Sequence, residues 1–290
     1  MDVFRYVQKV MEPMKPLETG VTPTLPVLDG VDAVIFDVYG TLIISAAGDI
    51  SLGRDSVSVE GMRMALERLE GFVGNTDPAR LSALYETALD RHQAEERSDG
   101  VLHPEVEIRI VWRDIIAELG GEQVSEEVIE EVALIYECAV NPVWLMPGVE
   151  NLLKSIESAG IPMGIISNAQ FYTPPIFEAL MKKSLTDLGF EQDLLIFSYE
   201  HGEGKPSLRL YEEMCQRLKQ RGIEAESVFY LGNDMRKDVV PAKSIGFRSG
   251  LFAGDMRSLR TDGVDLESLS LKCDAVITEL EQTALVVGLR

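Results

Sequence analysis

Short apolar runs rich in β-branched and aromatic residues recur along the chain, and in its second half they alternate with helical patterns. Buried parallel strands have this continuous apolar character. The runs cover residues 33–39, 163–168, 194–200, 227–234 and 273–278. The helical patterns between the later runs end at Gly160, Gly189 and Gly222, and glycine is a common stop signal. Such alternation implies right-handed crossovers, so we predict an α/β fold with an open parallel sheet.

One long stretch, residues 46–145, departs from this alternation because its pattern is almost wholly helical. It separates the first apolar run from the second, so we expect a helical second domain inserted into the α/β core. Residues 1–30 are rich in proline and suggest an arm packed on the surface or a partly ordered leader. We therefore divide the chain into an N-terminal extension (1–30), an α/β core (31–45 and 146–290) and a helical insert (46–145).

The composition is that of a globular protein with an acidic surface. Of the 290 residues, 46% are hydrophobic, and the formal net charge is −21, which argues against nucleic acid or an anionic membrane as a partner. Cys138, Cys215 and Cys273 lack the spacing of a disulfide framework or a zinc site, so we expect thiols in a reducing compartment. We find neither a secretory leader nor a membrane-spanning run, and we expect a cytoplasmic location.

Polar and small residues gather where the predicted strands end. Ligands of an open parallel sheet bind at the carboxyl ends of its strands, so these residues are the candidates for a functional site. They are Asp37, Tyr39, Gly40 and Thr41 after the first run, Ser167 and Asn168 after the second, Lys205 in the loop after the third, and Asn233, Asp234 and Asp238 after the fourth.

These residue types suit a hydrolytic site. Asp37 can act as the nucleophile, because a carboxylate can attack phosphorus or carbon and form an intermediate that water later clears. Thr41 or Ser167 can hydrogen-bond the transferring group, and Gly40 permits a close backbone approach. Lys205 can offset the charge between the nucleophile and an anionic substrate.

The three carboxylates raise an electrostatic problem. Without a cation, Asp37, Asp234 and Asp238 would repel one another and any anionic substrate, and one lysine could not cancel this repulsion. A Mg²⁺ ion would relieve it, since magnesium favours one or two carboxylates together with waters and substrate oxygens. We therefore expect a magnesium cofactor.

Four short motifs, in this order, resemble those of the haloacid dehalogenase superfamily, whose members are mostly phosphatases. They are DVYGT from Asp37, ISN ending at Asn168, the pair Lys205 and Pro206, and GNDMRKD ending at Asp238. Four motifs in order at predicted strand ends are much more specific than one alone. The resemblance implies a Rossmann-like core, a C1 cap at residues 46–145, covalent catalysis through Asp37, and a small-molecule anionic substrate beneath the cap.

Tyr39 is the main departure from the phosphatase pattern. In those phosphatases the residue two past the nucleophile is a second Asp, which protonates the leaving group and then activates water. A phenol with a pKa of about 10 is a poor acid at neutral pH. DxYGT is similar to the motif of the family's 2-haloacid dehalogenases. Their reaction needs no second acid, because halide leaves without a proton.

The fourth motif, in contrast, resembles that of the magnesium-dependent branch, because it retains an extra acid. By family analogy the backbone carbonyl of Tyr39 is another metal ligand beside the carboxylates. Asn233 occupies the usual position of the first acid in this motif, and the sequence does not decide whether Asn233 or Asp234 faces the metal.

Three functions are compatible with these motifs: a magnesium-dependent phosphohydrolase, which we favour; a metal-free 2-haloacid dehalogenase in which Asp238 activates water; and a binding protein on a decayed hydrolase scaffold. A monomer and a homodimer are both compatible with the sequence. We predict catalytic roles for Asp37, Tyr39, Lys205 and Asp238, substrate contacts for Gly40, Thr41, Ser167 and Asn168, and metal ligation by Asp37, Tyr39, Asn233, Asp234 and Asp238.

Overall fold

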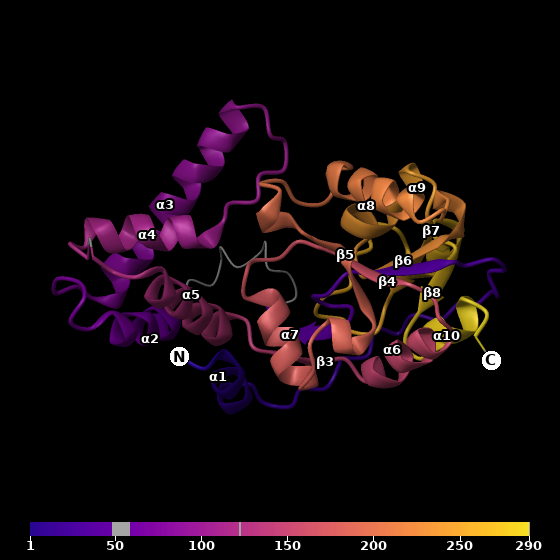
Figure 1. The fold of residues 1–290 in the computed structure, drawn as a ribbon, viewed down its shortest axis with the longest axis horizontal. Helices are drawn as coiled ribbons and strands as arrows, with labels where there is room; N and C mark the ends of the chain where they lie inside the picture. Colours follow the sequence, from indigo (N-terminus) through magenta and orange to yellow (C-terminus); the bar gives the residue numbers. More distant parts are fainter. Residues whose placement is uncertain (48–58, 122, 290) are drawn as a thin grey trace.

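The computed structural model describes residues 1–47, 59–121 and 123–289, and its centre is a six-stranded sheet (Figure 1). The spatial order is β5-β4-β1-β6-β7-β8, and every neighbouring pair in this order is parallel. The predicted α/β fold is therefore confirmed. The strands are β1 (Ala33–Phe36), β4 (Met163–Ser167), β5 (Phe190–Phe197), β6 (Val228–Gly232), β7 (Arg248–Phe252) and β8 (Ala275–Ile277).

The central strand β1 is apolar and buried on both faces, because helices cover both sides of the sheet. Ala33 and Ile35 pack in one hydrophobic cluster, and Val34 and Phe36 pack in another, as expected for alternating strand residues. The first face is covered by α8 (Arg209–Gln220) and α9 (Val240–Ser244), the second by α6 (Val149–Ser158), α7 (Thr173–Met181) and α10 (Gln282–Val286).

Three details of the predicted elements were wrong. Strand β5 begins at Phe190 and ends at Phe197 instead of covering 194–200, because polar residues in its first half hid its start. Strand β7 was missed because its sequence RSGLF holds an arginine and a glycine instead of a continuous apolar run. Gly250 is needed there, since an added Cβ would lie 2.6 Å from Cζ of Phe229. The helical pattern that we extended to Gly189 ends at Met181, because Lys182 adopts a left-handed φ of 57°.

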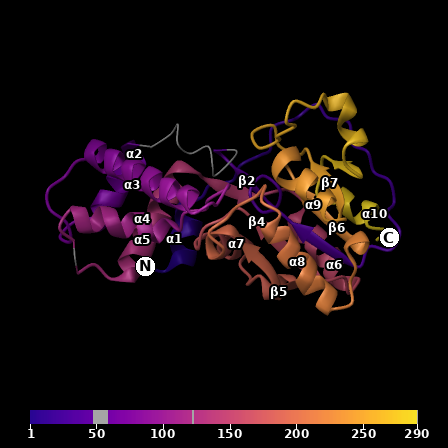
Figure 2. The same ribbon diagram turned by 90° about the horizontal axis from the view of Figure 1, so that it is seen from above.

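The helical insert leaves and rejoins the core through a short antiparallel pair, β2 (Ile43–Ser45) and β3 (Val143–Leu145). Its helices lie to one side of the sheet (Figure 2), and residues 48–58 and 122 of the insert lie outside the described residues. Its status as a separate domain stays a prediction. The helices are α2 (Val59–Leu69), α3 (Pro78–Ser98), α4 (Ile108–Glu118) and α5 (Glu126–Val140).

The N-terminal extension begins with α1 (Val3–Val10), which contacts α7. Gln8 Nε2 donates to the carbonyl of Ala179 at 3.1 Å. Farther on, Thr24 pairs antiparallel with Val276 of the edge strand β8. The extension therefore lies along the core. None of the helices in the described ranges is long and apolar enough to cross a membrane.

Candidate active site

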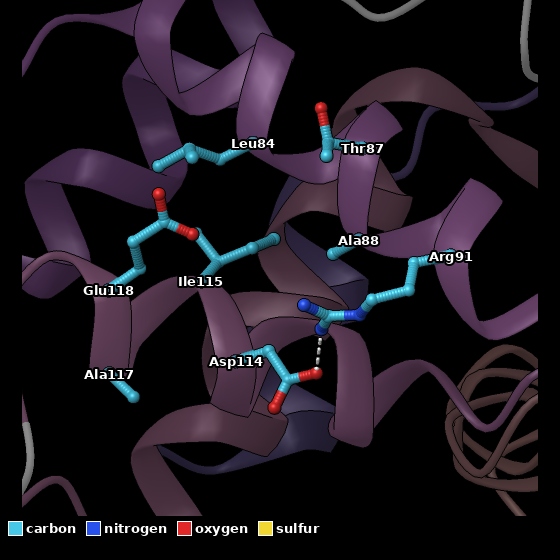
Figure 3. A pocket seen from close by; sticks show the side chains of 8 residues that line it. All are labelled: Leu84, Thr87, Ala88, Arg91, Asp114, Ile115, Ala117 and Glu118. Carbon is cyan, nitrogen blue, oxygen red and sulfur yellow. Dashed lines mark hydrogen bonds and ion pairs between the residues drawn. The ribbon is translucent and has the colours of Figure 1, made fainter.

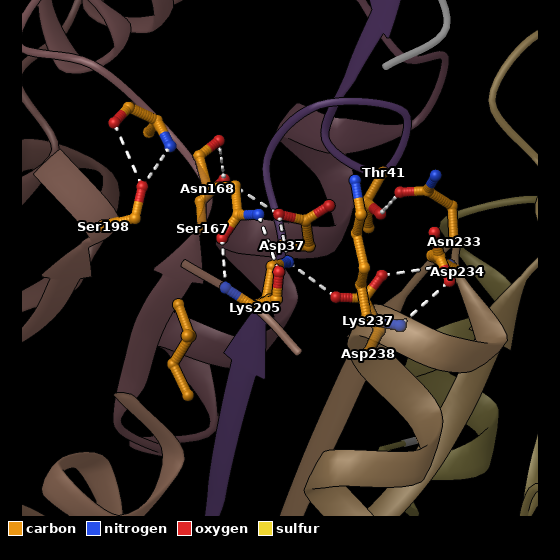
Figure 4. Close-up of polar contacts among 12 residues, drawn as sticks. Asp37, Thr41, Ser167, Asn168, Ser198, Lys205, Asn233, Asp234, Lys237 and Asp238 are labelled. Atoms are coloured by element: carbon orange, nitrogen blue, oxygen red, sulfur yellow. Dashed lines mark hydrogen bonds and ion pairs between the residues drawn. The ribbon is translucent and has the colours of Figure 1, made fainter. Parts of the chain in front are cut away.

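The carboxyl ends of β1 and β6 and the loop after β5 bring Asp37, Lys205 and Asp238 into contact (Figure 4). Nζ of Lys205 lies 2.8 Å from Oδ1 of Asp37 and 2.6 Å from Oδ1 of Asp238. The exposed fractions of Asp37, Lys205 and Asp238 are 7%, 5% and 1%. These predicted site residues form a buried charged triad.

Burial and charge oppose each other in this triad. Burial lowers the pKa of Lys205, but the Asp238 and Asp37 carboxylates outweigh it and raise the net pKa. Burial raises the pKa of Asp37 to about 6, and Asp238 adds to this rise while Lys205 limits it. At neutral pH the lysine is therefore an ammonium ion, and Asp37 is mainly a carboxylate, the form that can attack.

Asp238 is held by groups of β6 and the loop that follows it. The Tyr230 hydroxyl lies 2.9 Å from Oδ1 of Asp238, and the N–H of Asp234 donates to Oδ2 at 3.0 Å. Gly232 leaves room for this carboxylate, because an added Cβ would lie 2.3 Å from Cγ of Asp238. The sequence analysis missed Tyr230, and the only signal was a phenol within a buried strand, where its hydroxyl needs a partner.

Ser167 and Asn168, at the end of β4, have different partners. The Ser167 hydroxyl donates to Oδ1 of Asp37 at 2.8 Å. Asn168 instead binds the backbone of Lys205, accepting from its N–H at 2.6 Å and donating to its carbonyl at 3.2 Å. Ser167 thus contacts the candidate nucleophile, and Asn168 positions the lysine.

Gly40, Thr41 and Asn233 form a neutral cluster with Ser258, which the sequence analysis did not anticipate. Thr41 donates to Oδ1 of Asn233 at 3.0 Å, and Nδ2 of Asn233 donates to the Ser258 carbonyl at 2.7 Å. That carbonyl fixes the orientation of the Asn233 amide, since only its NH₂ group can donate. Gly40 has a φ of 80°, and a Cβ there would lie 2.5 Å from Cβ of Ser258. The close approach of Gly40 is therefore made to Ser258.

Asp234 caps the single-turn π-helix at Met235–Val239. Its Oδ1 accepts from the N–H groups of Arg236 and Lys237 at 2.8 and 2.9 Å, and burial raises its pKa. Oδ2 of Asp234 and Oδ2 of Asp37 accept no hydrogen bond from the described residues.

Within the same ranges, no three Asp, Glu, His or Cys side chains are grouped as a metal cluster. A magnesium ion does not require three, because it also binds waters and backbone carbonyls. Oδ2 of Asp37 and Oδ2 of Asp234 are therefore each available as a carboxylate donor, the ligand type that magnesium favours.

The Tyr39 hydroxyl lies 3.0 Å from Oγ1 of Thr173, at the start of α7. Tyr39 is buried in the main hydrophobic cluster, and burial raises its pKa well above the usual value for a phenol. The charge of the buried Glu137, which accepts from the hydroxyl of Tyr172 at 3.0 Å, raises the pKa of Tyr39 further. Tyr39 is therefore an even weaker acid here than a phenol in water.

A separate hollow of about 170 Å³ lies within the helical insert, between α3 and α4 (Figure 3). Nη2 of Arg91 pairs with Oδ2 of Asp114 there at 2.5 Å. None of the predicted site residues lines this hollow, so the carboxyl ends of the strands are the better candidate site. The lining residues are Leu84, Thr87, Ala88, Arg91, Asp114, Ile115, Ala117 and Glu118.

Two phosphatases are similar to part of the chain. The ribulose-1,5-bisphosphate 5-phosphatase of Halopiger xanaduensis is 29% identical over 143 residues, which are 49% of this chain and 56% of that protein. The glyceraldehyde 3-phosphate phosphatase of Methanothermobacter thermautotrophicus is 26% identical over 138 residues, 47% of this chain and 57% of that protein. The match thus spans little more than half the length of these relatives.

Among solved structures, a 2-haloacid dehalogenase from Pseudomonas syringae pv. Tomato aligns with a TM-score of 0.58 and 18% identity, over 89% of this chain and 98% of that one. At this identity the likeness concerns the fold alone. The model of the haloacid dehalogenase-like hydrolases matches residues 31–246, a range that includes every predicted site residue from Asp37 to Asp238. The chain therefore belongs to the family of haloacid dehalogenase-like hydrolases.

Proposed function

We propose that this hydrolase is a magnesium-dependent phosphohydrolase that acts on a small phosphorylated metabolite through Asp37. The observation that carries the proposal is the asymmetry of the Asp37 carboxylate. Lys205 and Ser167 each hold Oδ1 at 2.8 Å, while Oδ2 accepts no hydrogen bond from the described part of the chain. A carboxylate fixed by one oxygen can present the other to an electrophile. The similarity to two phosphatases supports phosphorus as that electrophile.

The proposed reaction has two steps. Oδ2 of Asp37 attacks phosphorus, an aspartyl phosphate forms, and the bond to the leaving oxygen breaks with its electron pair on that oxygen. Water then attacks the phosphorus, which releases phosphate and restores the carboxylate. Lys205 offsets the charge beside the nucleophile in both steps.

Tyr39 restricts the leaving groups. General acid help is typically worth about 10²- to 10⁴-fold in rate, and the buried phenol, which contacts Thr173, is a poor source of it. Acyl and aryl phosphates need this help least, because their leaving oxygens are stable without a proton. We expect such substrates to react faster than alkyl phosphates.

We assign magnesium to the Asp37 and Asp234 carboxylates, with the Tyr39 carbonyl as a further donor. When bound, the ion would offset negative charge on the phosphoryl group. Asn233 is the less suitable candidate, because its amide oxygen and nitrogen are already hydrogen-bonded. Both oxygens of Asp238 also accept hydrogen bonds.

A 2-haloacid dehalogenase is the second candidate, and Tyr39 is the residue that favours it. Asp37 would then attack carbon and displace halide, and Asp238 would activate the water that hydrolyses the ester. This reaction needs no proton on the leaving group and no metal ion.

Phosphate release separates the two candidates. We would assay aryl, acyl and alkyl phosphates, including ribulose bisphosphate and glyceraldehyde 3-phosphate, with magnesium or with EDTA. The wild type is compared with Asp37→Asn and with Asp32→Asn, a matched change at an exposed position. Magnesium-dependent release that only Asp37→Asn abolishes supports the phosphohydrolase. Halide release from 2-haloacids in EDTA, with no phosphate release, would overturn it.

A further inference from the structure

The loop between β7 and β8 contacts the neutral cluster that contains Gly40, Thr41 and Asn233. We call residues 253–260 the buttress loop. Its Ser258 carbonyl accepts from Asn233 Nδ2 at 2.7 Å, and the N–H of Arg260 donates to the Asn233 carbonyl at 3.0 Å. The N–H of Met235 donates back to the Arg260 carbonyl at 2.8 Å. The buttress loop therefore binds both the side chain and the backbone of the fourth motif.

The same loop also limits where the first motif can lie. Cβ and Oγ of Ser258 would be 2.5 and 2.8 Å from a Cβ at Gly40. Since Gly40 follows Asp37 by three residues, a displacement of Ser258 would change the packing beside the candidate nucleophile.

The N-terminal extension holds the outer side of the buttress loop. The Thr19 hydroxyl donates to the Ala253 carbonyl at 2.8 Å, and the N–H of Leu17 donates to Oδ1 of Asp255 at 3.2 Å. The N–H of Met256 donates to the Leu17 carbonyl at 3.0 Å. Arg257 in addition donates to the carbonyl of Lys15.

The buttress loop does not satisfy its own buried polar atoms. Asp255 and Ser258 are 1% and 0% exposed, yet Oδ2 of Asp255 and Oγ of Ser258 find no hydrogen-bond partner in the described ranges. A buried polar atom without a partner costs free energy, so surrounding structure must hold such a loop in place. The extension supplies these contacts.

We infer that residues 15–19 are positioning residues for the active site, acting through the buttress loop on Asn233 and Gly40. Both the extension and the loop lie outside residues 31–246, the range that the family model matches. The inference rests on the proposed function, because it takes the site beside Asp37 to be the hydrolytic one. It adds a role for a segment to which that function assigns none.

The test uses three variants of the full chain. Thr19→Val removes the hydroxyl that binds the buttress loop, and Thr19→Ser keeps it. Thr283→Val is the matched control, because Thr283 is fully buried and its hydroxyl has no hydrogen-bond partner among the described residues. Hydrogen exchange is measured at the Met235 and Arg260 amides, which pair the loop with the fourth motif, and at the Ile35 amide of β1 as a reference.

We expect Thr19→Val to speed exchange at Met235 and Arg260 but not at Ile35, and Thr19→Ser and Thr283→Val to resemble the wild type. On a substrate that the wild type hydrolyses, Thr19→Val should lower kcat by roughly three- to tenfold with little change in KM. Unchanged exchange at Met235 and Arg260, or equal acceleration at Ile35, would overturn the inference. Exchange requires no turnover, so it decides this inference even where absence of phosphatase activity refutes the proposed function.

Discussion

The two sides of the candidate site are built from different interactions. On one side Asp37, Lys205 and Asp238 form a buried charged triad. On the other, Gly40 and Asn233 are held by neutral hydrogen bonds and close packing against Ser258. Charges act over several ångströms and supply the chemistry, whereas close packing fixes positions to a fraction of an ångström. The charged side can be predicted from the residue types in the sequence. The neutral side cannot, because it depends on which loops contact each other in the folded protein.

The largest effect is expected from Lys205→Met. Removing the ammonium group leaves the Asp37 and Asp238 carboxylates buried without their cation, and breaking a buried pair in this way costs about 3–5 kcal/mol. The free energy of unfolding in urea is the measurement. Lys243→Met is the control, since Lys243 is 41% exposed in its pair with Asp274, and a surface pair contributes at most about 1 kcal/mol. Equal losses for the two variants would contradict the importance that we give to burial.

Gly40→Ala tests the neutral side. Alanine at a positive φ costs about 1–2 kcal/mol, and overlap with Ser258 adds about 1–3 kcal/mol. Gly30→Ala is the matched control, because Gly30 has a φ of 70° and nothing within 4 Å of an added Cβ. We expect urea unfolding to show a greater loss for Gly40→Ala than for Gly30→Ala. Similar losses would mean that Ser258 can move away from the added Cβ without lowering the free energy of unfolding.

Asn233→Asp exchanges a neutral partner for a charged one. The carboxylate cannot donate to the Ser258 carbonyl, so we expect a loss of about 1–2 kcal/mol without metal. The added charge lies beside Asp234, and magnesium should then raise the melting temperature of the variant more than that of the wild type. An equal response of the two proteins to magnesium would place residue 233 outside the reach of the ion.

The smallest effect concerns Glu105, a carboxylate whose hydrogen-bond partners are neutral groups, the Ser198 side chain and Nε2 of Gln170 at 2.6 Å. Burial raises the pKa of Glu105 to about 7 from its usual 4.5. The unfolded chain therefore loses this proton first, and the free energy of unfolding should fall as the pH rises from about 4.5 to 7. The full shift corresponds to roughly 3 kcal/mol, but Glu105 is only half-buried and solvent screens its charge. Glu105→Gln should therefore remove this part of the slope and be more stable by about 1 kcal/mol above pH 7.

Thermal unfolding between pH 4 and 8 measures this difference. Glu191→Gln serves as a control, because Glu191 pairs with Arg221 at the surface. A Glu105→Gln variant that follows the wild type at every pH would show that the Glu105 carboxyl titrates at its usual pKa.

Several strands were predictable because a buried strand requires apolar residues in its own local sequence. The segments that became β1, β4, β6, β8 and the second half of β5 are continuous and apolar, as buried parallel strands require. Strand β7 has no such apolar run. Its Gly250 is explained by a contact with Phe229 of the neighbouring strand, which the local sequence does not show. The end of α7 at Met181 was also not predicted, because the left-handed φ of Lys182 occurs without a glycine.

The sequence by itself determined the α/β fold and the set of polar residues at the strand ends, because alternating strands and helices place the carboxyl ends of parallel strands at one edge. Only the tertiary structure decided what each of those residues contacts. Thr41 donates to Asn233, Tyr39 contacts Thr173, and Asn168 binds the backbone of Lys205. The physical reason is that hydrogen bonds and steric contacts act over a few ångströms, between segments that can be more than a hundred residues apart in the chain.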